Sequence, residues 1–444
     1  MMVGMAGEET RTVDTRTSMP STERGATAVP RTDETPRTRA WATRLVVVGI
    51  VLAALNLRPA ITSFGALLEE VRDGLGMSGS VAGLLTSVPP LCFAVFGVTA
   101  PRLARRFGPA AVVCAGMVAI AAGLLIRPYA GGTAGFLAAS ALALMGIAVS
   151  NVLMPVIVKR WFPDRVGSMT GLYSMALALG TSAAAAVTVP VTHALGGGWR
   201  PGLAVWAGLA AAAVLPWLPV VRGRGAAPEP APVPEPGDPA GERPQQAPLR
   251  ITRSRTAWAL AVFFGLQATA AYITMGWMAQ IFRDAGVPAG TAGILLAVTM
   301  VMGVPLAFVI PRVATRLPHQ GPIVLVLGAC GLVGYAGLYF APAGGAWAWA
   351  VLLGVSNCAF PLALTMVGMR ARTGPGVGQL SAFAQSTGYL ISIPGPLLVG
   401  VLYQHSGGWG LPIALMAALM LPQMVVGFLA GRDRVVEDEA AATR

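Results

Sequence analysis

Arg58 is the residue of this sequence best suited to chemistry, because it lies in the middle of a long apolar segment. The segment covers residues 45–68, and about 20 apolar residues span a bilayer core, so Arg58 falls near mid-membrane. A cation there costs roughly 2.5–3.5 kcal/mol on insertion scales and normally faces a protein interior or a watery cavity. Its guanidinium could bind a small anion, or it could only bond backbone carbonyls of neighbouring helices.

Pro59 follows Arg58 directly and should loosen the helix beside the charge. It has no N–H to donate, and its ring crowds the carbonyl of Leu55. A weakened helix next to a charge near the midplane is typical of transporter binding sites. Asn56 reaches the same cavity only if the helix is distorted, whereas Thr62, four residues after Arg58, shares its face.

Two asparagines could line the same cavity from other segments. Asn151 and Asn357 each stand four residues before a proline, Pro155 and Pro361, so each asparagine carbonyl loses its helical donor. Hydrogen bonding between helices is the other role open to them.

Five further polar residues are candidates for substrate binding. Gln385 and Tyr389 are spaced i, i+4 and share a helix face. Gln267 and Tyr272 lie in one segment without sharing a face, so we expect only one of them to reach the cavity. Tyr173 is the fifth candidate.

Acidic residues are absent from the interiors of the apolar segments. All 19 carboxylates fall in tails, loops, the linker or segment ends, so a carboxylate proton relay has no candidate. A proton would have to travel with the substrate or at the cavity mouth; otherwise the protein is a facilitator or an anion exchanger. The four cysteines form no CxxC pair, so we expect no metal, no redox site and no cofactor.

Composition places the chain in the membrane. It is 55% hydrophobic and 11% charged, where a soluble domain carries about 25% charged residues. The net charge is +12, but the basic residues are not gathered on one face, so we expect no nucleic acid as a partner. The expected partners are a lipid bilayer and a small-molecule substrate. Because backbone groups must be satisfied in lipid, the apolar segments must be helices.

Twelve segments are long and apolar enough to span, which predicts an all-α membrane protein with 12 transmembrane helices. They lie at 43–68, 79–100, 109–130, 132–157, 166–192, 200–221, 257–281, 290–311, 320–341, 346–369, 375–403 and 409–431. With a cytoplasmic N-terminus, 26 of the 31 basic residues fall inside, while Arg72, Arg127, Arg200 and Arg283 fall outside. This bias predicts a cell-membrane protein with both termini in the cytoplasm.

A proline-rich stretch divides the chain into two halves. We predict a disordered tail at 1–42, a six-helix half at 43–221, a cytoplasmic linker at 222–256, a second six-helix half at 257–431 and a tail at 432–444. The halves repeat each other: the sequence at 82–85 returns at 292–295, and Ser150-Asn151 returns as Ser356-Asn357. Two parallel six-helix halves related by an axis along the membrane normal form the architecture of major facilitator transporters.

The loop after the second segment, residues 103–108, reads Leu-Ala-Arg-Arg-Phe-Gly and resembles the cytoplasmic loop motif of the major facilitator superfamily. That motif usually reads Gly-x-Leu-Ala-Asp-Arg-x-Gly, and here Pro101 and Arg105 replace its first glycine and its aspartate. The resemblance implies gating roles for a set of loop residues in both halves. These residues are Arg102, Arg106, Gly108, Arg312 and Arg316.

Within that superfamily, residues 56–60 (Asn-Leu-Arg-Pro-Ala) and residues 380–389 (Leu-Ser-Ala-Phe-Ala-Gln-Ser-Thr-Gly-Tyr) resemble the cyanate and nitroimidazole transporter branch. The resemblance implies a monomer that moves a small solute by alternating access. Our leading hypothesis is uptake or exchange of a small anion, such as a cyanate-like or small organic anion. The alternative is efflux of a neutral heterocycle or drug, such as a nitroimidazole. No paired carboxylates, nucleophile elbow or phosphate loop favours an enzyme.

Overall fold

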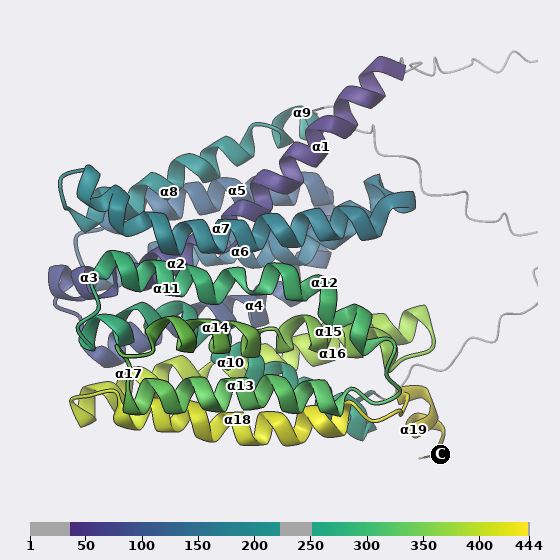
Figure 1. Cartoon of the computed structure of the whole chain (residues 1–444). Coiled ribbons are helices and arrows are strands. Elements are labelled where there is room, and N and C mark those ends of the chain that lie inside the picture. Colours follow the sequence, from purple (N-terminus) through teal and green to yellow (C-terminus); the bar gives the residue numbers. More distant parts are fainter. Residues whose placement is uncertain (1–35, 223–250, 443–444) are drawn as a thin grey trace, which may run out of the picture.

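A computed structural model of the chain describes residues 36–222 and 251–442, and regular structure in these two ranges is helical throughout (Figure 1). Most of the predicted N-terminal tail and most of the predicted linker lie outside the described residues. The all-helical prediction is confirmed for the described part of the chain.

The described N-terminal part, residues 36–222, contains nine α-helices and two short 3-10 turns. They are α1 (Pro36–Asn56), α2 (Pro59–Ala66), α3 (Leu68–Leu75), α4 (Gly79–Phe107), α5 (Pro109–Ile126), η1 (Arg127–Tyr129), α6 (Thr133–Trp161), η2 (Pro163–Arg165), α7 (Val166–Ala194), α8 (Trp199–Val214) and α9 (Trp217–Arg222).

The described C-terminal part, residues 251–442, contains ten α-helices after one short 3-10 turn. They are η3 (Ile251–Arg253), α10 (Arg255–Asp284), α11 (Ala289–Val301), α12 (Gly303–Ala314), α13 (Gly321–Phe340), α14 (Ala346–Asn357), α15 (Ala359–Met369), α16 (Gly374–Ser392), α17 (Pro394–Ser406), α18 (Gly410–Ala430) and α19 (Val436–Ala442).

Eleven spans among the described residues are long and apolar enough to cross a membrane, and they coincide with eleven of the twelve predicted segments. The remaining segment, 200–221, is divided into α8 and α9. Pro216 lies at this division, where it cannot donate a backbone hydrogen bond. The sixth segment is therefore helical along most of its length, but its first helix has only 16 residues.

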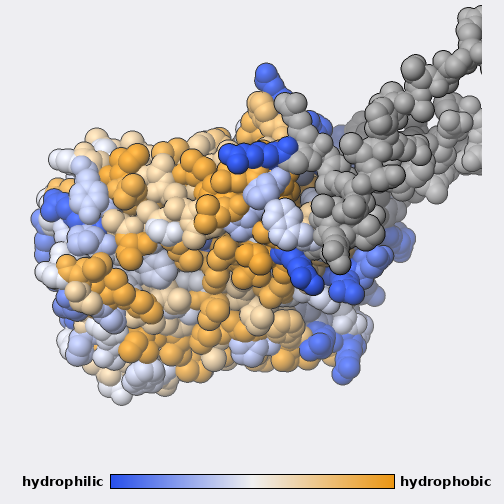
Figure 2. Space-filling model, turned by 90° about the horizontal axis from the view of Figure 1, so that it is seen from above, coloured by the Kyte–Doolittle hydropathy of each residue, from blue (hydrophilic) through white to orange (hydrophobic). Residues whose placement is uncertain are grey.

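The described ends of the chain share one end of the bundle. In Figure 1 the start of α1, the end of α9 and α19 all lie at the right, whereas α3 and α17 lie at the left. We call these the terminal end and the α3 end. The face drawn in Figure 2 is largely hydrophobic over the middle of the helices, and hydrophilic residues gather toward both ends. Such a band suits contact with lipid between two watery surfaces.

The two halves pack closely near the α3 end, where glycines let α4 and α17 approach. A Cβ added to Gly83 would lie 2.9 Å from the Leu397 carbonyl oxygen, and one added to Gly400 would lie 2.4 Å from the Gly79 carbonyl oxygen. Small residues at a helix interface allow this backbone approach in membrane proteins. Any larger side chain at Gly400 would therefore separate the halves here.

Candidate functional site

Arg58 lies in a break between α1 and α2, as predicted from Pro59. Its backbone leaves helical geometry, and its carbonyl accepts from the Ile61 amide at 2.9 Å and the Thr62 hydroxyl at 3.2 Å. The break turns the start of α2 into a new helix N-terminus at the level of the guanidinium. Because the positive end of a helix dipole lies there, the break adds to the positive potential of Arg58.

Arg58 is half-buried as a residue, and its guanidinium is not sealed by carbonyls. It lies over the Phe93 ring, 5.6 Å from the ring centroid, and its Nη1 atom is buried without a hydrogen-bond partner. Among the described residues no carboxylate pairs with it and no backbone carbonyl accepts from its side chain. A buried donor without a partner is costly, so this one is available to a ligand.

Three tyrosines from different helices surround the guanidinium. Tyr173 of α7, Tyr272 of α10 and Tyr389 of α16 all lie close enough to Arg58 to interact with it electrostatically. Tyr272 lies within hydrogen-bonding reach of Arg58, although its buried hydroxyl makes no hydrogen bond of good geometry. The site therefore draws its hydroxyl groups from both halves of the chain.

Aromatic rings connect the two halves beside Arg58. Phe93 of α4 stacks on Tyr389 at 5.0 Å between centroids, and Phe264 of α10 meets the edge of Tyr389 at 5.2 Å. Aromatic pairs of this geometry contribute about 0.5–1.5 kcal/mol beyond their buried area. Phe93 and Phe264 were not predicted from the sequence, since a phenylalanine in an apolar segment carries no signal of its position.

The two asparagines are engaged in their own halves. Asn151 accepts a short hydrogen bond from the Tyr173 hydroxyl. The Asn357 carbonyl and side-chain oxygen both accept from Gln267 Nε2, each at 2.9 Å. The carbonyl freed by Pro361 is thus taken up by a side chain, and Gln423 of α18 extends the network to Gln267 at 2.9 Å.

Three other candidates make hydrogen bonds away from the Arg58 guanidinium. The Asn56 amide donates to the carbonyls of Leu52 and of Leu209 on α8, so it ties α1 to α8. Thr62 donates to the Arg58 carbonyl, and Gln385 donates to Ser381 one turn earlier at 2.7 Å. These hydrogen bonds hold helix structure and helix packing and do not reach the Arg58 guanidinium.

The loop residues expected to gate lie at the terminal end. Arg102, Arg106, Arg312 and Arg316 are exposed, and no ion pair involving them occurs in the described part of the chain. Gly108 has a φ of 85°, a conformation that favours glycine, where α4 gives way to α5. Their gating role remains a prediction.

Contacts between the halves close the α3 end, and their pairing could not be predicted from the sequence. Arg283 of α10 bridges Glu69 at 2.8 Å and Glu70 at 2.9 Å, both on α3. The Ser80 hydroxyl donates to Gln404 at 2.7 Å. The two glutamates were predicted to lie at segment ends or in loops and Arg283 on the outside, but only the packing of the halves pairs them.

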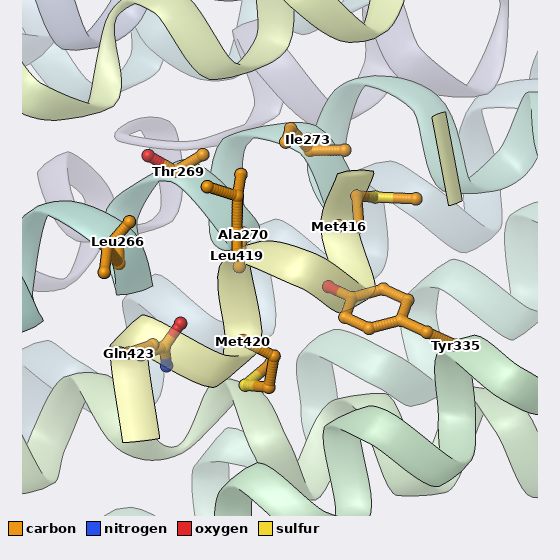
Figure 3. Close-up of a pocket in the computed structure, with 9 residues that line it drawn as sticks. All are labelled: Leu266, Thr269, Ala270, Ile273, Tyr335, Met416, Leu419, Met420 and Gln423. Atoms are coloured by element: carbon orange, nitrogen blue, oxygen red, sulfur yellow. The ribbon is translucent and has the colours of Figure 1, made fainter. Parts of the chain in front are cut away.

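A small cavity lies among α10, α13 and α18 of the C-terminal half (Figure 3). Its lining is mostly apolar, with Thr269, Tyr335 and Gln423 as the polar exceptions. No charged side chain lines it, so it offers an anion less than the surroundings of Arg58. No cluster of three or more potential metal ligands occurs among the described residues.

Comparison with known proteins places this architecture in a family. The model of the Major Facilitator Superfamily matches residues 48–373. The chain belongs to this superfamily. The inward-open structure of the xylose transporter XylE from E. coli has the same fold, with a TM-score of 0.67 at 11% identity, covering 90% of this chain and 99% of that one.

Two relatives of this major facilitator transporter have named substrates. The 2-nitroimidazole transporter of Escherichia coli (strain K12) is 32% identical over 409 residues, covering 88% of this chain and 96% of the relative. The cyanate transport protein CynX of the same organism is 30% identical over 379 residues, covering 85% and 94%. The resemblance to this branch, drawn from residues 56–60 and 380–389, is confirmed.

Proposed function

We propose that this transporter moves a small anion across the membrane and binds it at the Arg58 guanidinium. The observation that carries the proposal is a cation at a helix break that has a free donor atom and no acidic partner among the described residues. An uncompensated charge at low dielectric attracts a counter-charge strongly. An arriving anion would neutralise Arg58 and accept its free Nη1–H.

The surroundings of Arg58 favour a flat anion with delocalised charge. The guanidinium faces the Phe93 ring, and that ring stacks on Tyr389. A planar solute could accept hydrogen bonds from Arg58 and Tyr272 at its edge while its face lies against these rings. A cyanate-like ion or a small organic anion fits this description, and one of the two relatives is named as a cyanate transport protein.

Alternating access would expose this site to each side in turn. Arg58 and Tyr173 belong to one half, and Tyr272 and Tyr389 belong to the other, so rocking of the halves would take the site apart and rebuild it. With the α3 end closed, we infer that the solute leaves or enters at the terminal end in this state. Because no acid lies inside the described spans, we infer a facilitator or an exchanger without a carboxylate relay.

We further infer a monomer in the plasma membrane, with the terminal end in the cytoplasm. The described ends of the chain share that end of the bundle (Figure 1), and most arginines flank it. A transporter needs no catalytic group, and none is proposed. Efflux of a neutral nitroimidazole is the second candidate, because the aromatic rings would bind such a solute even without a charge on it.

Replacing Arg58 by Gln tests the anion site. We expect purified wild-type protein to be stabilised by a small planar anion such as cyanate or benzoate, and uptake of that anion into proteoliposomes. Arg58→Gln should weaken binding at least about 30-fold, because losing one partner of a buried charge pair costs about 2–5 kcal/mol. Arg160→Gln, which removes an exposed arginine, is the matched control.

Binding that survives in Arg58→Gln would refute the anion site. If instead only neutral 2-nitroimidazole stabilises both proteins, the second candidate is favoured. Transport can be followed together with internal pH. A proton flux that disappears when one acid is removed would contradict the absence of a carboxylate relay.

A further inference from the structure

Arg127 is a second buried guanidinium that the transport proposal does not use. The sequence placed it at the outside end of the third segment, and its side chain is only 3% exposed there. Nη1 donates to the Ala60 carbonyl at 2.8 Å and Nη2 donates to the Ser63 hydroxyl at 3.3 Å, both on α2. The Phe136 ring lies 5.8 Å from the guanidinium carbon. All these partners are neutral.

Arg127 lines a small cavity between α2, α4 and α6. The other polar side chains in the lining are Thr86 and Ser140, and the rest of the lining is apolar. Thr86 is already satisfied, since it donates to Gly83 and accepts from Trp277. Arg127 Nε and Ser140 Oγ, by contrast, are both buried without a hydrogen-bond partner. Two side chains with unused donors therefore line one small cavity.

We propose that this cavity binds a single halide-sized anion, such as chloride, between Arg127 and Ser140. The space holds about one water molecule, which excludes a polyatomic organic anion. Water could satisfy both donors but would leave the buried charge uncompensated, because no acid pairs with Arg127 among the described residues. An anion satisfies the donors and the charge together, so electrostatics favour it over water.

This site is separate from the proposed substrate site but connected to it by α2. Arg58 precedes the first residue of α2, and Arg127 holds the carbonyl of Ala60, the second residue. The anion would lie beside the segment that fixes the position of Arg58. It would also lie beside Thr86, which contacts Trp277 of the other half at 3.2 Å.

Thermal unfolding in chloride tests the proposal on the full chain. Purified protein is titrated with sodium chloride against sodium gluconate at constant ionic strength, and unfolding is followed by tryptophan fluorescence. We expect a saturable rise in Tm with chloride. Ser140→Ala should raise the half-saturating concentration about tenfold, because it removes one hydrogen bond to a charged group. Arg127→Gln should abolish the chloride effect.

Two controls identify the site. Ser150→Ala removes another buried hydroxyl without a partner from the same helix, outside this cavity, and should leave the chloride effect unchanged. Arg58→Gln should also retain it, even where substrate binding is lost. A chloride effect that is absent from the wild type, survives in both Ser140→Ala and Arg127→Gln, or disappears in Arg58→Gln would overturn the proposal. Since Ser140→Ala is a mild change, the test stands even if Arg127→Gln fails to fold.

Discussion

The two halves treat their buried arginines in opposite ways. Arg370 of the C-terminal half is 1% exposed, and it donates to the carbonyls of Ala430 and Gly431, to Gln320 and to Asp433. Arg58 and Arg127 of the N-terminal half each keep a buried nitrogen without a partner. A guanidinium whose N–H groups all find acceptors within the protein stabilises the fold. A guanidinium with an N–H group that has no acceptor can bind a ligand.

The first helices of the two halves differ in the same way. The first span of the N-terminal half breaks at Arg58, but its counterpart, α10, continues for 30 residues. α10 carries Gln267 near its middle, and Asn357 and Gln423 satisfy the hydrogen-bonding groups of that amide. A neutral amide of this kind is satisfied within a continuous bundle. A charge requires a break, a cavity or a counter-ion.

The largest contrast is expected between Arg370→Gln and Arg58→Gln. The first change leaves several buried acceptors without their donor and should lower the free energy of unfolding by about 3–5 kcal/mol, the usual cost of breaking a buried charged network. The second removes a charge that is not neutralised, and should leave the free energy of unfolding unchanged or raise it. Thermal unfolding of both variants without ligand measures the difference. Equal losses of stability would abolish the distinction between the two arginines.

Sequence patterns were sufficient for the parts of the molecule that depend on local chemistry. The eleven long spans follow from hydropathy, and the break at Arg58 follows from Pro59. The sequence shows that the Asn357 carbonyl needs a donor from outside its helix. It does not show that this donor is Gln267, because the two residues are 90 positions apart in the chain. Gln423 could have been suspected only as a lone amide in an apolar segment.

Packing between distant segments decided what the sequence did not predict. Arg127 was assigned to the outside end of its segment, but the chain turns its side chain inward against Ala60. Tyr173, Tyr272 and Tyr389 come from three helices, and periodicity within each helix cannot show that they meet. The C-terminal residues 436–442 were expected only as part of a tail, yet they form a helix that docks on the bundle.

The acidic residues of α19 give the C-terminal half a source of negative charge at its terminal end. The interior of the N-terminal half, where Arg58 and Arg127 lie, has no such acids among the described residues. Glu439 accepts from Ser254 at 2.6 Å and from the Thr256 hydroxyl at 2.7 Å, where α10 begins. Burial alone would raise the pKa of Glu439, but these hydrogen bonds outweigh it and the pKa is lowered. The pKa of Glu437 is lowered too, since hydrogen bonds from Arg372 and Thr373 outweigh its burial.

These lowered pKa values predict a loss of stability in acid. The stabilisation is complete above the unfolded-state pKa of about 4.3 and disappears as the pH falls through the lower folded-state values. Glu439→Gln should cost about 1 kcal/mol near neutral pH, as for loss of a helix cap, and should flatten the decline in Tm below about pH 4.5. Asp438→Asn, which breaks an exposed pair with Arg372, should cost less. An unchanged acid decline in Glu439→Gln would assign the pH dependence to other groups.

The smallest effect is expected at the α3 end, where the two halves meet through charges in partial contact with water. The Arg283, Glu69 and Glu70 side chains are 15%, 44% and 32% exposed. Ion pairs of this kind contribute at most about 1 kcal/mol, so Arg283→Gln should open this end about two- to five-fold more often. Pulsed electron paramagnetic resonance between labels at Asp73 and His405 would measure the open fraction.

Arg200→Gln is the matched control for this last variant. Arg200 lies toward the same end of the bundle but donates to Pro128 within its own half, at 3.2 Å. Its loss should leave the distance distribution unchanged. If both variants widen the distribution equally, then net charge at the α3 end, rather than the bridge between the halves, governs closure. The halves would then be held together by their uncharged contacts, such as the glycine contacts of α4 and α17.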